Sequence, residues 1–116
     1  MSKRNIIQLS EFDITQKIIE SLSNVCTRSV LFSVKNESKD VTQIANELKI
    51  SLSTVYKTLS TLEDLALAEI DRYVISPEGK KIKLYRSRIG KVEITLDDLE
   101  PTLILHPNDY NHKTSN

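Results

Sequence analysis

The first half of the chain carries apolar residues at helical spacing. After a stretch with few packing signals, which we expect to be a flexible arm (residues 1–9), Ser10 and Asp13 can cap a first helix. This helix runs to about residue 22, because apolar residues recur there every three or four positions, at Phe12, Ile18, Ile19 and Leu22. A second helix begins at Ser23 or Asn24 and ends in the polar stretch 35–39. Its apolar residues are Val25, Val30, Leu31 and Val34.

Two further helices follow, each with its own N-terminal cap. Asp40 and Gln43 have the spacing of a capping box, in which each side chain bonds the other residue's backbone amide. The third helix therefore begins here, and its buried positions are Ile44, Ala45 and Leu48. Ser51 is the best N-cap candidate in the chain and begins a helix over 52–65. The apolar face of that helix consists of Val55, Leu59, Leu62 and Leu65.

After residue 68 the apolar period becomes that of a strand. Tyr73 and Ile75, then Ile82 and Leu84, predict two strands with alternating exposure. The residues between them, Ser-Pro-Glu-Gly at 76–79, suit a type I turn, because proline presets φ and glycine tolerates the exit. With Ile82 and Leu84 turned inward, we expect the opposite face of the second strand to carry Lys81, Lys83 and Tyr85.

Beyond this hairpin the pattern weakens. Val92, Ile94 and Leu96 alternate with polar residues and predict a third strand. In 97–105 we expect at most a short helical turn, because Pro101 opposes a longer helix. This segment is a possible dimer contact, since a free terminus rarely exposes so many apolar residues: Leu99, Leu103, Ile104 and Leu105. Residues 106–116 are polar and aperiodic, so we expect a disordered tail.

Composition fits one mainly α-helical domain with a small β-hairpin over residues 10–96. The chain has 116 residues, 39% hydrophobic and 28% charged, which is ordinary for a globular protein. No apolar run approaches the roughly 20 residues that span a membrane. The first nine residues also lack the pattern of a secretory signal. We therefore expect a cytoplasmic protein.

The net charge is zero, but the charges are unevenly distributed. Residues 72–91 hold one acid, Glu78, against seven bases: Arg72, Lys80, Lys81, Lys83, Arg86, Arg88 and Lys91. Acids gather before and after this segment, at Glu63, Asp64, Glu69, Asp71, Asp97, Asp98 and Glu100. A local positive potential of this kind favours a polyanion such as nucleic acid, whatever the net charge.

Residues 41–65 have the layout of a helix-turn-helix, and the outward face of the second helix suits DNA. With the apolar face assigned, the outward residues are Ser53, Thr54, Tyr56, Lys57, Ser60 and Thr61. None is acidic, whereas a merely solvated helix face usually mixes Glu with Lys. Hydroxyls and lysine can bond base edges and phosphates in the major groove, and the first turn of a helix offers free amides to phosphate.

The hairpin after this helix carries lysines at and beyond its turn. Lys80, Lys81 and Lys83 can reach backbone phosphates or the adjacent minor groove. The alternative is that they only prevent the exposed strand edge from pairing with other chains.

The run VTQIANELKISLSTVYKTLSTLEDLALAEI resembles the helix-turn-helix of winged-helix transcriptional regulators, and EGKKIKLYR resembles their wing. The similarity covers residues 12 to about 90 and is closest to compact ArsR-like regulators, less specifically to TrmB-like archaeal ones; STVYKTL is its most distinctive part. The resemblance implies a winged helix-turn-helix fold that binds specific sequences of duplex DNA. It gives the recognition role to Ser51, Ser53, Thr54, Tyr56 and Lys57, and the wing role to Lys80 and Lys81.

The chain departs from the pattern of these regulators in two places. They often have glycine shortly after the recognition helix, where this chain has Ala66. The helix exit therefore differs or carries strain of about 1 kcal/mol. Metal-sensing ArsR-like proteins carry paired cysteines on the preceding helix, and residues 41–49 contain none. We expect the single cysteine, Cys26, to be a small buried apolar residue; a redox or metal role across a dimer would need a second ligand.

Nothing in the sequence indicates catalysis or a cofactor. Gly79 and Gly90 are the only glycines, so a glycine-rich phosphate loop is excluded, and no serine and histidine pair as nucleophile and base. His106, Asp109 and His112 lie in the predicted tail without cysteine support, so we expect no metal site.

We expect a homodimer on duplex DNA, with dimer contacts from the first helix and from residues 96–105. The main alternative is a winged helix that binds another protein within a transcription or other macromolecular assembly, which would equally explain the zero net charge. RNA binding is a third hypothesis. It has little support, because the only aromatic side chains we identify for stacking on RNA bases are Tyr56, Tyr73 and Tyr85.

Overall fold

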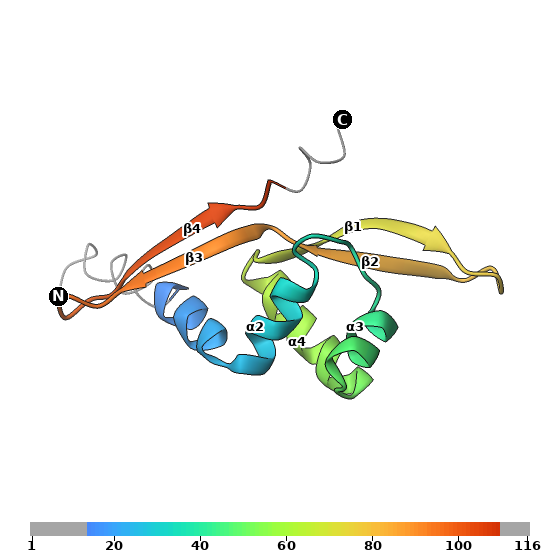
Figure 1. Cartoon of the computed structure of the whole chain (residues 1–116), viewed down its shortest axis with the longest axis horizontal. Coiled ribbons are helices and arrows are strands. Elements are labelled where there is room, and N and C mark those ends of the chain that lie inside the picture. Colours follow the sequence, from blue (N-terminus) through green and yellow to red (C-terminus); the bar gives the residue numbers. More distant parts are fainter. Residues whose placement is uncertain (1–13, 110–116) are drawn as a thin grey trace, which may run out of the picture.

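The computed structural model describes residues 14–109, in which four helices precede two β-hairpins (Figure 1). A helix over 14–23 leads into α2 (Val25–Ser33), α3 (Val41–Leu48) and α4 (Leu52–Asp64). The predicted arm, the cap at Ser10 and Asp13, Phe12, and residues 110–116 of the predicted tail lie outside the described range.

The N-terminal caps of α2, α3 and α4 follow the sequence. Asn24, one of the two predicted candidates, caps α2 and accepts a hydrogen bond from the Thr27 amide. Asp40 and Gln43 form the predicted capping box of α3. Ser51 caps α4, as predicted. These caps satisfy amides that have no partner within the helix, and they fix where each helix begins.

The apolar faces of the helices meet in one core. Its fully buried side chains include Val30, Leu31, Val34, Ile44, Val55, Leu59 and Leu62, all assigned to buried faces from the sequence. Val25 differs most from expectation, since it is 65% exposed at the first helical position of α2, and Leu48 and Leu65 are only partly buried. The core holds α4 in place with its opposite face free.

The first hairpin, called the wing below, consists of β1 (Ala68–Ile75) paired antiparallel with β2 (Lys81–Ser87). The predicted turn is confirmed: the Gly79 amide donates to the Ser76 carbonyl at 2.8 Å, and Gly79 has φ of 84°. The expected alternation of exposure in β1 is wrong, since Tyr73 to Ile75 are all exposed. The outer half of the wing projects beyond the helices, so neither of its faces is covered (Figure 1). Four helices followed by this hairpin confirm the winged helix-turn-helix class.

A second hairpin, β3 (Ile89–Thr95) with β4 (Thr102–Pro107), extends from the opposite side of the molecule (Figure 1). β3 is the predicted third strand, although it ends before Leu96. The helical turn expected within 97–105 is wrong, because residues 97–100 form a bend and Pro101 directly precedes β4, outside the ladder. β4 also includes His106 and Pro107, so regular structure extends two residues into the segment for which we expected disorder.

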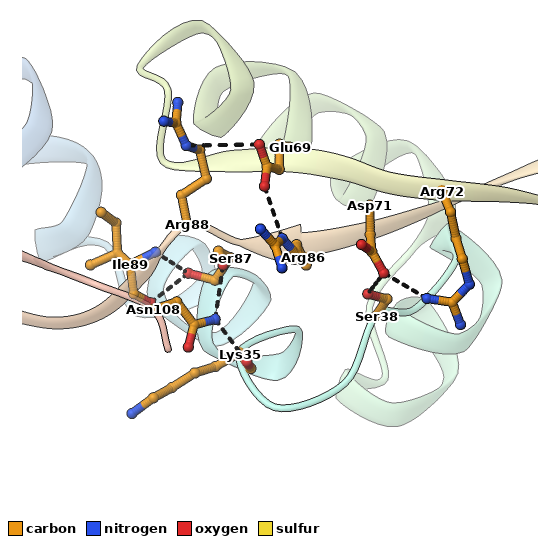
Figure 2. Close-up of polar contacts among 10 residues, drawn as sticks. All are labelled: Lys35, Ser38, Glu69, Asp71, Arg72, Arg86, Ser87, Arg88, Ile89 and Asn108. Atoms are coloured by element: carbon orange, nitrogen blue, oxygen red, sulfur yellow. Dashed lines mark hydrogen bonds and ion pairs between the residues drawn. The ribbon is translucent and has the colours of Figure 1, made fainter. Parts of the chain in front are cut away.

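A short polar joint fastens the second hairpin to the helices (Figure 2). Only Arg88 separates β2 from β3, and the buried Ser87 hydroxyl accepts from the Ile89 amide and donates to the Ile89 carbonyl. The Asn108 side-chain amide donates to the carbonyls of Lys35 and Ser87, both at 2.9 Å. The end of β4 is thereby tied to the loop after α2.

Candidate nucleic-acid interface

The outward face of α4 carries the side chains that the sequence assigned to it. Ser51, Ser53, Tyr56, Lys57, Ser60 and Thr61 are exposed, and Thr54 is half-buried. Glu63 and Asp64 are exposed at the C-terminal end of the helix, far from its cap. The first turns of α4 therefore present hydroxyls, one phenol and one ammonium group without a carboxylate.

Some of these hydroxyls have structural roles. Ser51 Oγ accepts from the Thr54 amide at 3.1 Å and donates to Thr54 Oγ1 at 2.8 Å, so both side chains maintain the helix cap. Thr61 Oγ1 donates to the carbonyl of Lys57. By contrast, the side chains of Tyr56, Lys57 and Ser60 have no hydrogen bond or ion pair within residues 14–109. These three are the most available to a ligand.

The base of the wing is anchored to the loop between α2 and α3. Lys39 and Tyr85 exchange backbone hydrogen bonds of 3.1 and 2.8 Å, as in an antiparallel pair. A register shift between Ile70 and Arg72 coincides with Asp71, whose carboxylate accepts from Ser38 Oγ at 2.6 Å (Figure 2). These contacts fix the direction in which the wing leaves the body.

Tyr85 corrects one expectation about the wing. The sequence placed it on the exposed face with Lys81 and Lys83, but it is 5% exposed and belongs to the core. Burial, together with the negative charge of Glu63, raises the pKa of the Tyr85 phenol. The three residues do share a face, since side chains two apart in a strand lie on the same side. At Tyr85 this face packs against the core, and further along the wing, at Lys83 and Lys81, it is exposed.

An open groove runs between the helix-turn-helix and the wing. The start of α3 lines it with Asp40, Val41 and Thr42, α4 with Tyr56, and the wing with Lys80, Lys81, Ile82, Lys83 and Tyr85. The fold thus brings the phenol of the predicted recognition helix and all three predicted wing lysines to one groove. Of the predicted recognition residues only Tyr56 lines it; the others do not: Ser51, Ser53, Thr54, Lys57, Ser60 and Thr61.

Ion pairing divides the basic residues of the wing into two groups. Near its base, Arg86 and Arg88 pair with Glu69 at 2.8 and 3.8 Å, and Arg72 pairs with Asp71 at 2.6 Å (Figure 2). Lys80, Lys81 and Lys83 form no ion pair within the described part of the chain. Lys81 Nζ lies 4.8 Å from the centre of the Tyr73 ring, a cation–π contact that steers the ammonium without neutralising it. The unpaired charge is therefore concentrated on the outer wing.

Sequence reasoning missed Thr42 and Tyr73 in this region. Thr42 is exposed on the first turn of α3 and lines the groove. Tyr73 pairs with Lys83 across the wing and so lies beside the lysines. The hairpin register, which the turn residues determine, could have indicated Tyr73. Thr42 depends on the packing of α3 against the wing and left no local signal.

The exit from α4 takes the strained form that the missing glycine implied. Ala66 has φ of 60°, in the left-handed region. Its amide donates to the Glu63 carbonyl at 2.9 Å, and the Leu67 amide donates to the Leu62 carbonyl at 2.8 Å. This is the hydrogen-bond pattern of a Schellman motif, which normally favours glycine at this position.

Residues 14–109 offer few other groups that could form a metal, redox or titratable site. No group of three or more His, Cys, Asp or Glu residues there could hold a metal ion, and no helix of this range is both long and apolar enough to cross a membrane. Cys26 is half-buried on α2. His106 bonds Glu93 across the second hairpin, and this hydrogen bond lowers the pKa of the Glu93 carboxyl. His112 lies outside the described residues.

Comparison with known proteins agrees with this geometry. The sequence model of the family described as "Bacterial regulatory protein, arsR family" matches residues 28–69. An "Uncharacterized HTH-type transcriptional regulator" of Methanocaldococcus jannaschii is 33% identical over 66 residues, which cover 57% of this chain and 70% of the relative. The chain belongs to the ArsR-like helix-turn-helix regulators. The family match spans most of α2, all of α3 and α4, and the first residues of β1. The wing lysines and the second hairpin of this ArsR-like protein lie beyond the matched segment.

Proposed function

We propose that this ArsR-like chain is a sequence-specific duplex DNA-binding regulator that reads the major groove with the helix at 52–65. In this proposal the wing turn, 76–81, contacts the phosphate backbone or the adjacent minor groove. The observation that carries it is the groove between helix-turn-helix and wing, where Tyr56 and the unpaired lysines Lys80, Lys81 and Lys83 line one channel. A basic groove beside an acid-free helix face suits a polyanionic duplex.

The division of roles follows from the chemistry of the two surfaces. The side chains of Tyr56, Lys57 and Ser60 have no protein partners within residues 14–109, so they can exchange water for base edges at little internal cost. Lysines without ion pairs release counterions when they meet phosphates, and this gives affinity without sequence preference. Ser53 completes the proposed recognition surface together with Thr54, which also takes part in the helix cap, while Ser51 and Thr61 contribute chiefly through the helix they stabilise.

Selection of bound fragments from random duplex DNA tests the proposal most directly. If a dimer makes about 6–10 phosphate contacts, affinity should fall about 10³–10⁵-fold between 50 and 200 mM salt. Replacing Lys80 and Lys81 by alanine should reduce the slope of log affinity against log salt, yet keep sequence preference. Lys17→Ala combined with Lys91→Ala removes two exposed lysines outside the groove and is the charge-matched control. An unchanged slope when Lys80 and Lys81 are replaced would rule out backbone contacts by the wing turn.

Sequence preference should depend on α4. Tyr56→Ala or Lys57→Ala should lower the ratio of specific to non-specific affinity, because losing a good base contact costs about 1–3 kcal/mol. Thermal melting should stay near that of the parent, since both side chains are exposed. Val55→Asp is the contrasting variant: Val55 is fully buried, so a charge there should destabilise the fold. Absence of preference for any selected duplex would refute the regulator proposal.

The second candidate function is a protein-binding module, which would equally explain the zero net charge. A partner that binds equally tightly after Tyr56 and Lys57 are replaced, in a chain without duplex preference, would support that alternative. The predicted homodimer also stays a prediction.

A further inference from the structure

The outer half of the wing exposes apolar side chains next to its lysines. Ile75 is 67% exposed and Tyr73 is 48% exposed. Across the ladder Ile75 pairs with Lys81, and Tyr73 pairs with Lys83. These four side chains therefore lie on one face of the hairpin, called the wing patch below. Within residues 14–109 neither of its two apolar side chains is buried.

The wing patch continues the groove between the helix-turn-helix and the wing. Both lysines of the patch line that groove together with Tyr56 of α4, and the two apolar residues lie across the ladder on β1. At the base of the wing the same face carries Tyr85, which packs against the core. The outer wing projects beyond the helices (Figure 1). A duplex held against α4 along this groove would therefore meet the patch with its next base pairs.

The charges of the wing patch are free to meet phosphates. Lys81 and Lys83 form no ion pair within residues 14–109. The ammonium of Lys81 stays charged beside the ring of Tyr73, 4.8 Å from its centre. Glu78 is the only acid of residues 72–83, and it lies in the turn, beyond the last pair of the ladder. The patch thus combines apolar side chains on β1 with unpaired cations on β2.

This combination is suited to the minor groove of a duplex, and not only to a row of phosphates. Phosphates border the groove, and apolar side chains can contact the sugars and base edges inside it. A·T pairs present only acceptors there, whereas a G·C pair adds the N2 amino group of guanine, a donor. An isoleucine against this amino group would displace its water without replacing the hydrogen bond, which disfavours G·C.

We propose that the wing patch enters the minor groove next to the base pairs contacted by α4, and that it favours A·T over G·C pairs there. Ile75 is the discriminating side chain, because it is the more exposed apolar residue and, unlike Tyr73, has no atom that accepts from guanine. Lys81 and Lys83 hold the patch on the phosphates without adding preference. This inference rests on the proposed DNA-binding function and adds a second base preference, separate from that of α4.

The flanks of a selected duplex test this inference without changing the protein. Short blocks of base pairs next to the selected site are made A·T, G·C or inosine·C in turn. Inosine keeps the O6 and N7 acceptors of guanine in the major groove but lacks its minor-groove amino group. At the block under the wing, the parent should bind A·T and inosine·C flanks within about twofold of each other, and G·C flanks about 5- to 100-fold more weakly.

A single substitution tests whether Ile75 causes this preference. Ile75→Thr keeps a β-branched side chain but adds a hydroxyl that can accept from guanine, so the difference between A·T and G·C flanks should fall to about twofold or less. Val74→Thr is the matched control and should keep the preference, since Val74 is 37% exposed on the opposite face of the wing. Neither variant alters charge, so both should retain the salt dependence of the parent. Thermal melting checks that both fold, and the inosine comparison decides even without a variant.

The outcomes separate this inference from the DNA-binding function. If the parent selects a duplex through Tyr56 and Lys57 but binds all flanks equally, the minor-groove inference fails and the DNA-binding function stands. Inosine·C flanks that bind as weakly as G·C flanks would overturn the inference, as would an equal loss of preference in Val74→Thr. An unchanged preference in Ile75→Thr would also overturn it, because lysines that respond to groove width would then suffice. A chain that selects no duplex overturns both proposals and leaves the patch to a protein partner.

Discussion

Replacing Asn108 by alanine tests how the second hairpin is held to the helices. The side-chain amide of Asn108 donates to the carbonyls of Lys35 and Ser87, and its backbone amide donates to the Arg88 carbonyl (Figure 2). The variant removes the two side-chain bonds and leaves the backbone bond. The two carbonyls then lack this donor at a partly buried site.

The size of the effect follows from the two lost bonds. A typical intramolecular hydrogen bond contributes about 0.5–1.5 kcal/mol, so the loss should be about 1–3 kcal/mol of unfolding free energy. In a domain of this size each kcal/mol shifts the melting temperature by roughly 4 °C, which predicts a decrease of about 4–12 °C. Water can reach a half-buried position and replace part of the bonding, which favours the lower end of this range.

Thermal melting and hydrogen exchange together measure this loss. If the hairpin unfolds with the rest of the chain, the melting temperature falls; if β4 detaches alone, the amides of Thr102–Pro107 exchange faster instead. Asn36→Ala is the control, since Asn36 is exposed in the loop beside Lys35. If Asn108→Ala matched the parent in both measurements, the joint would not hold the hairpin, and the reasoning would be refuted.

Three further changes probe single features of the fold. Ala66→Gly should raise stability by about 0.5–1 kcal/mol in thermal or denaturant unfolding, because φ of 60° strains alanine; a loss would contradict that strain. Gly79→Ala should destabilise the wing by about 1 kcal/mol through its φ of 84° alone, since no atom lies within 4 Å of the added methyl, and chemical shifts of the wing should report it. Glu93→Gln should make the melting temperature fall less steeply as the pH is lowered into the acid range. The His106 bond lowers the folded pKa of Glu93, so its stabilisation is present above the ordinary glutamate pKa and is lost as pH falls below that value and through the lowered folded pKa. Parallel profiles of parent and variant would contradict this.

Local chemistry made the helices predictable. A cap involves residues three apart, and a buried face repeats every three or four residues, so Asn24, Asp40 and Ser51 could be read from short windows. The same holds for the wing turn, where Pro77 and Gly79 each favour the observed backbone. The outward residues of α4 followed by elimination once its apolar face was assigned.

Features that depend on distant partners were not predictable in this way. β4 was missed because residues 97–100 carry no glycine turn signal, and its pattern gains meaning only opposite β3. Tyr85 was placed outward because the alternation rule assumes one covered face, whereas the loop before α3 also pairs with this strand. Asn108 was assigned to a disordered tail, since its two acceptors lie 73 and 21 residues away.

The arrangement of the two hairpins also resolves the tension between zero net charge and DNA binding. The wing lysines lie on one hairpin and the acidic tip, the exposed acids Asp97, Asp98 and Glu100 between β3 and β4, lies on the other; the two hairpins project in opposite directions from a molecule 58 Å long (Figure 1). Salt screens exposed charges beyond about 8 Å at physiological ionic strength, so the tip acids should not repel a duplex bound along the wing. Asp97→Asn combined with Glu100→Gln should therefore leave the salt dependence of binding to a single half-site unchanged, although it alters net charge by two. A steeper slope or tighter binding in that variant would mean that the tip lies within electrostatic reach of the DNA, contrary to the opposed hairpins.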